Sequence, residues 1–226
     1  MDKLIFIILF FFMNGIVYGQ FIPGSHVGQR AVLVGSKLYF IGGDDNDESD
    51  TTSDVFYFDN GAELSSTGLL QFVDLKNQAT FPYVGFHVAG EGGVNQDLIF
   101  ISGGYQLTAN SPNVVYQLDT KTNTVTTPTI QGTNPPRRKD MDSVSYQGKI
   151  YIFGGRIVVN STNTFFNNFD ILDTINLNWE VGTLVGAPQP IFGYTSTLVN
   201  GIIYYIGGIQ KTATDQSYVF MDIVRL

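Results

Sequence analysis

The sequence predicts an all-β fold of the β-propeller type. Four apolar runs, rich in β-branched and aromatic residues, each end in two glycines. The pairs are Gly42 and Gly43, Gly103 and Gly104, Gly154 and Gly155, and Gly207 and Gly208. Such runs predict strands covered on both faces, because a half-exposed strand would alternate polar and apolar residues. The first glycines of successive pairs are 61, 51 and 53 residues apart. A period near ~50 residues with several short strands per unit is typical of radially arranged sheets.

A second strand is expected after each glycine pair, and each of these segments ends in Asp: residues 55–59, 115–119, 169–173 and 219–222. Asp119 and Asp173 are followed by the same turn, whose Asp, Thr and Asn side chains can hydrogen-bond their own backbone. Six positions after the Asp, Val125 or Trp179 is expected to begin the outer strand. In the first unit, residues 67–75 are assigned to that strand.

The combined pattern resembles the kelch repeat: an apolar strand, a double glycine, a Tyr-containing strand and a spaced Trp. The resemblance covers residues 29–226, although only the third unit has the Trp. It implies a kelch-type β-propeller over residues 20–226, in a family whose members usually have five to seven blades. This chain has four recognisable units, and its eight paired glycines are interpreted as structural residues of the repeat.

Closure of the array has two interpretations. The fourth unit stops at Leu226, before its outer strand is expected, and residues 20–23 could supply that strand and close a four-blade ring. An incomplete, open array is the other interpretation, and it would leave an unpaired edge and an exposed blade face.

Residues 1–19 are predicted to be a signal peptide rather than part of the fold. A charged start precedes a short apolar run over residues 4–12, and a small residue, Gly19, precedes a cut ahead of Gln20. The run is shorter than the ~20 residues that span a bilayer, so secretion is favoured over an uncleaved signal anchor that tethers the chain to a membrane.

Composition excludes several functions. The chain has no cysteine, which removes thiolate chemistry, disulfides, cysteine-bound zinc and iron–sulfur clusters. Its net charge of −8 argues against nucleic acid or an anionic membrane surface as partner. No membrane span is expected after the leader is removed, and no cofactor is expected.

Several candidate sites also have structural explanations. An acidic loop at residues 44–50 could hold a cation, but it lacks the spacing of an EF-hand and is better explained as a solvated loop. His26 and His87 both lie sixteen residues before a double glycine, which raises the idea of paired ligands; a structural role is favoured. Arg137 or Arg138 is interpreted as a positioning residue. Asn160, in the sequon at residues 160–162, is a candidate glycosylation site in the loop after Gly155.

Three functions follow from the resemblance. The favoured one is a secreted, non-catalytic module that binds an extracellular protein or a surface glycan through the variable loops after the glycine pairs. The second is kinship with galactose oxidase, a copper enzyme on the same scaffold. Its cofactor needs a tyrosine crosslinked to a cysteine, which this chain cannot supply, so no catalytic, cofactor-binding or metal residues are assigned. The third is a shortened family member without a separate function.

Overall fold

The computed structural model shows an all-β chain, which confirms the predicted fold class. It describes residues 21–44, 52–61, 70–76, 78, 80–105, 112–184, 187–211, 216–218 and 221–225. These residues contain strands and turns but no helix, and so no helix long and apolar enough to cross a membrane.

The strands form four antiparallel blades, each numbered from its inner strand outwards. Blade 1 consists of β1 (Arg30–Val34), β2 (Lys37–Ile41), β3 (Val55–Asp59) and β4 (Phe72–Asp74). Blade 2 consists of β5 (His87–Gly92), β6 (Leu98–Gly103), β7 (Tyr116–Asp119) and β8 (Thr124–Thr126). Blade 3 consists of β9 (Ser143–Tyr146), β10 (Lys149–Phe153), β13 (Phe169–Asp173) and β14 (Asn178–Val181). Blade 4 has three described strands, β16 (Thr195–Val199), β17 (Ile202–Ile206) and β20 (Met221–Arg225).

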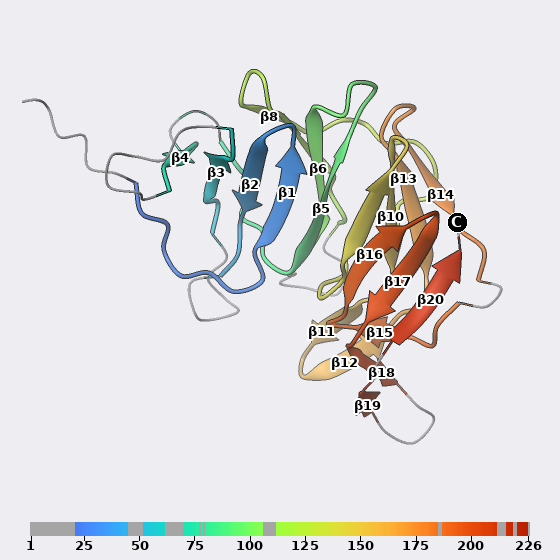
Figure 1. Ribbon diagram of the computed structural model, residues 1–226. Coiled ribbons are helices and arrows are strands. Elements are labelled where there is room, and N and C mark those ends of the chain that lie inside the picture. Colours follow the sequence, from blue (N-terminus) through green and yellow to red (C-terminus); the bar gives the residue numbers. More distant parts are fainter. Residues whose placement is uncertain are drawn as a thin grey trace, which may run out of the picture.

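The blades stand side by side like a fan, from blade 1 at the blue end to blade 4 at the red end (Figure 1). Their inner strands β1, β5, β9 and β16 line one groove with a volume of about 320 Å³. Apolar side chains fill the space between neighbouring blades. Between blades 1 and 2 the buried cluster includes Tyr39, Ile41, Ile99 and Leu118, and equivalent clusters join blades 2 and 3 and blades 3 and 4. The hydrophobic core is therefore divided into layers, one at each junction.

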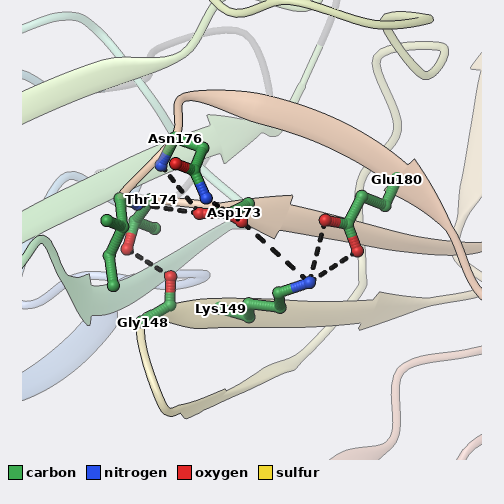
Figure 2. Close-up of polar contacts among 7 residues, drawn as sticks. Gly148, Lys149, Asp173, Thr174, Asn176 and Glu180 are labelled. Carbon is green, nitrogen blue, oxygen red and sulfur yellow. Dashed lines mark hydrogen bonds and ion pairs between the residues drawn. The ribbon is translucent and has the colours of Figure 1, made fainter.

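The Asp-containing turns have the side-chain hydrogen bonds expected of them. Asp173 accepts hydrogen bonds from the backbone N–H groups of Ile175 and Asn176, at 3.0 and 2.8 Å. Figure 2 shows Asp173 beside Asn176 in this turn. Asp119 holds the matching turn of blade 2 through the N–H groups of Lys121 and Thr122. Because these bonds fix the turn, the outer strands β8 and β14 follow within a residue of the predicted positions.

The structure does not place residues 21–23 as the outer strand of blade 4. These residues form no strand, and the ring of Phe21 packs against Phe56 of blade 1 at 5.5 Å between centroids. The array is therefore open in the described part of the chain, as the second interpretation expected. Residue 20 lies outside the described residues.

Two sequence assignments need correction. The segment after Gly155 is not a loop but a β-hairpin of β11 (Arg156–Val159) and β12 (Thr162–Phe165), joined by two residues with positive φ. A second hairpin, β18 (Ile209–Lys211) and β19 (Gln216–Tyr218), follows the last glycine pair and extends β15 (Ile191–Phe192).

The third strand of blade 4 does not end at Asp222, because β20 continues to Arg225, and residues 219–220 lie outside the described residues. Asp59 and Asp173 pair with the first residue of β2 and of β10, whereas Asp222 pairs with Tyr205 in the interior of β17. The residue equivalent to those two aspartates is Arg225, opposite Ile202.

Candidate functional site: the double-glycine end of the blades

The four glycine pairs lie at the same end of every blade, here called the double-glycine end. All eight glycines have positive φ, between 59° and 111°: Gly42, Gly43, Gly103, Gly104, Gly154, Gly155, Gly207 and Gly208. This backbone conformation costs little only for glycine, so the chain can turn sharply out of the second strand at each pair.

Each of the first three pairs holds the next blade in place. The second glycine of the pair donates its N–H to a carbonyl of the following blade: Gly43 to Val84, Gly104 to Arg138 and Gly155 to Ile191, at 2.7 to 2.8 Å. The first glycine packs against the same carbonyl. A Cβ at Gly103 would lie 2.7 Å from the Arg138 oxygen, and a Cβ at Gly154 would lie closer still to the Ile191 oxygen. The glycines are therefore needed for close packing of successive blades as well as for the turn.

The fourth pair does not share this second role within the described residues. Gly207 and Gly208 make the same turn, but a Cβ at Gly207 would meet nothing within 4 Å, in contrast to Gly42, Gly103 and Gly154. All four pairs therefore have the same backbone conformation, but only the first three contact a following blade among the described residues.

A second set of backbone hydrogen bonds links the segments that lead into the inner strands. Phe86 N–H donates to Gly28 at 2.8 Å, Asp140 N–H to Phe86 at 3.1 Å and Gly193 N–H to Asp140 at 2.8 Å. The four residues Gly28, Phe86, Asp140 and Gly193 all have positive φ. They are equivalent positions of the repeat, which the sequence does not reveal because two of them are not glycine.

The basic segment of residues 137–139 lies at the junction of blades 2 and 3. Arg138 is buried, pairs with the Asp170 carboxylate and lies 5.3 Å over the Phe166 ring. Burial lowers the pKa of Arg138 and raises the pKa of Asp170, and the charge of each partner opposes the other's shift. Arg138 thus has the contacts of a positioning residue.

Two neighbouring cations also pack within the junctions. Lys139 Nζ lies about 5 Å from the rings of Phe86 and Tyr105. Arg156 pairs with Asp140 at 2.5 Å and lies 4.3 Å from the Phe192 ring. These charges hold the start of blades 3 and 4, and their aromatic partners cover them from water.

His26 and His87 occupy different positions of the repeat, although their offsets in the sequence are equal. His26 precedes β1 and lies 3.3 Å from Asp54. His87 opens β5 and is fully buried, and neither ring nitrogen has a hydrogen-bond partner among the described residues.

The environment of His87 favours the neutral ring. Burial, followed by the charges of Arg30 and Arg137, lowers its pKa to about 3. Arg30 Nε donates to the His87 carbonyl at 2.7 Å. Arg137 is half-buried, which lowers its pKa, and its Nε has no hydrogen-bond partner within the described part of the chain.

The remaining candidate residues lie at the same end. Asn160 is exposed at the tip of the β11–β12 hairpin, where Asn160 and Ser161 both have positive φ. Asp44 is buried and forms a β-bridge with Val27, whereas residues 45–50 of the acidic loop lie outside the described residues. Among the described residues, no group of three or more His, Asp or Glu side chains could hold a metal ion.

These features define an antiparallel β-propeller array whose blades are joined through paired glycines. A family model described as the KLHDC2/KLHL20/DRC7 Kelch-repeats domain matches residues 28–226, and the chain belongs to the kelch-repeat family. This membership indicates a protein-binding module.

Curated relatives agree with the family. Kelch domain-containing protein 3 of Rattus norvegicus is 33% identical over 189 residues, which are 80% of this chain and 48% of the relative. The Homo sapiens protein of the same name is 32% identical over the same shares. Rho GTPase-activating protein gacHH of Dictyostelium discoideum is 29% identical over 56% of this chain and 8% of its own length. The chain spans about half the length of the first of these relatives.

Proposed function

We propose that the chain is a non-catalytic module that recognises a protein partner with the double-glycine end of its blades. Exposed aromatic side chains at this end carry the proposal. Tyr83 directly precedes Val84, whose carbonyl accepts the Gly43 N–H, and it is 70% exposed. Tyr218 of the β18–β19 hairpin is 83% exposed. Tyrosine is enriched at protein interfaces because it offers a large apolar surface and one hydrogen-bonding group.

The double-glycine end of the blades is a rigid base, which suits recognition. At this end of the blades Arg138 and Arg156 pair with carboxylates, Lys139 packs on an aromatic ring, and the backbone is hydrogen-bonded from blade to blade. Changes in the segments above would alter the binding surface without disturbing this base.

The test compares partners captured by the wild-type chain, by the double variant Y83A/Y218A and by Y146A. Tyr146 is an exposed tyrosine at the other end of the blades, beside the β9–β10 turn. We expect proteins that bind the wild-type chain and Y146A to be lost with Y83A/Y218A. Partners that bind all three chains equally would contradict the proposal, and selective loss of binding on a glycan array would favour a glycan ligand instead.

We further propose that the chain is secreted after removal of residues 1–19 and that Asn160 carries a glycan. The leader-like sequence and the exposed position of Asn160 at a hairpin tip support this. Expression in eukaryotic cells should yield a secreted chain that starts at Gln20 and shrinks on treatment with an N-glycosidase. T162A, which keeps Asn160 but removes the sequon, should abolish the shrinkage. A chain retained with residues 1–19 intact would contradict secretion.

A further inference from the structure

The junction that joins successive blades is made three times and left open at blade 4. Gly43, Gly104 and Gly155 each donate their N–H to the next blade, but Gly208 has no acceptor among the described residues. In the second set of backbone bonds, the Gly193 carbonyl accepts no hydrogen bond from the described residues, and the Gly28 N–H donates none to them. Both sets of junction bonds therefore stop at blade 4.

Two apolar side chains of blade 4 are also far more exposed than their equivalents in blade 1. Ile41 and Ile206 both directly precede a glycine pair, and they are 0% and 43% exposed. Val34 and Val199 both end an inner strand, and they are 9% and 48% exposed. Blade 2 covers Ile41 and Val34 in blade 1. The equivalent residues of blade 4 therefore form an exposed apolar face of the kind that another blade covers elsewhere in the array.

The opposite end of the array presents what blade 4 lacks. Residues 26–28 of blade 1 are equivalent to residues 84–86, which supply the carbonyl and the N–H at the junction of blades 1 and 2. Leu33 alternates with the buried Val32 and Val34, and its side chain is exposed on the face of blade 1 that no other blade covers. One chain therefore carries both halves of the repeated junction.

We propose that blade 1 of a second copy of this chain docks on blade 4. Gly208 N–H then donates to the carbonyl of His26 in the second copy, and Gly28 N–H of that copy donates to the Gly193 carbonyl. The contact is head to tail, and two copies make it twice in a closed ring if the four blades of each copy turn through half a circle; any other turn gives a longer assembly. In either case the groove lined by β1, β5, β9 and β16 continues from one copy to the next.

The first test is the mass of the full chain in solution, as the cell processes it, measured by sedimentation at tens of micromolar. We expect the wild-type chain at twice the monomer mass. V199K on blade 4 and L33K on blade 1 should each reduce it to the monomer, because each places a charge in the junction. The matched control V181K alters an exposed valine on β14, away from both open faces, and should remain dimeric.

The second test uses the close approach at the junction itself. Gly42 is the position equivalent to Gly207, and a Cβ at Gly42 would overlap the Val84 carbonyl oxygen of the next blade. G207A should therefore reduce the chain to the monomer, whereas G201A, at a glycine that also has positive φ but where a Cβ would meet nothing within 4 Å, should remain dimeric.

Two results would overturn the proposal. A monomeric wild-type chain, or a G207A chain that stays dimeric, would mean that a second copy does not cover blade 4. A dimer that survives L33K but not V199K would indicate pairing of two blade 4 edges.

Discussion

Buried polar side chains at the blade junctions decide how this fold responds to mutation and to pH. His87, Arg138 and Asp170 are all buried within or beside the junction of blades 2 and 3. Water is excluded from these groups, so a change of charge there is expensive.

Acid should destabilise the chain through His87. Its folded pKa is about 3, below the ordinary value, so the unfolded chain binds a proton that the folded chain does not. The free energy of unfolding should therefore decline as the pH falls from about 6.5 towards 3, by about 2 kcal/mol at pH 5. Urea unfolding at pH 7.5 and 5 would measure it.

The control for this effect is H87M, because Met141 takes the equivalent position in blade 3. The free energy of unfolding of H87M should fall about 2 kcal/mol less between pH 7.5 and 5 than that of the wild-type chain. An equal fall in the variant and the wild-type chain would show that His87 is not its source.

Loss of Asp170 should be far more harmful than loss of an exposed carboxylate. D170A leaves the buried Arg138 without its partner and should lower the free energy of unfolding by about 3–5 kcal/mol. E180Q removes the half-exposed partner of Lys149 and should cost at most about 1 kcal/mol. Similar unfolding midpoints for the two variants would contradict the assignment of Arg138 as a positioning residue.

The two glycines that begin their pairs in blades 2 and 4 provide a matched comparison. G103A and G207A both place Ala at positive φ, but only at position 103 does the new Cβ approach the next blade. G103A should be about 1–3 kcal/mol more destabilising than G207A, by urea unfolding of the monomer. Equal losses would mean that backbone strain is the whole cost.

Strands and turns join neighbouring blades at the other end as well. Thr174 Oγ accepts the Gly93 N–H at 2.9 Å and donates to the Gly148 carbonyl at 2.5 Å (Figure 2 shows the second bond). This one turn therefore connects the β5–β6 turn of blade 2 with the β9–β10 turn of blade 3.

Replacement of Thr174 by Val keeps the shape but leaves the Gly93 N–H without an acceptor. The variant should lose about 1–3 kcal/mol of stability, whereas T122V, in the exposed turn of blade 2, should change little. Amide exchange of Gly93 would locate the effect. Unchanged protection of that amide would contradict it.

Much of the element order could be predicted from the sequence, because each second strand is a clear apolar run ended by two glycines. The β11–β12 hairpin was missed, although a two-residue Asn-Ser turn between two β-rich segments is a recognisable signal. Asp222 was misassigned because it follows an apolar run, as the other strand-ending aspartates do. The residue that pairs with the first position of β17 is Arg225, three residues later. The hydrogen bonds through Phe86 and Asp140 had no signal, since these two residues have positive φ without being glycine.

The described residues form an open array of four kelch blades in which each junction repeats the same contacts. Its stability should be shared between blades and junctions, as in other repeat proteins. Within the described residues, the last blade differs from the first three in having three strands instead of four and in its uncovered face.

The most direct measurement of this account is amide hydrogen exchange at the second glycine of each pair, made on the monomeric V199K chain. The account predicts strong protection at Gly43, Gly104 and Gly155, whose N–H groups are bonded to the next blade, and fast exchange at Gly208. Equal protection at all four glycines would contradict an open array and indicate that blade 4 is covered within one chain.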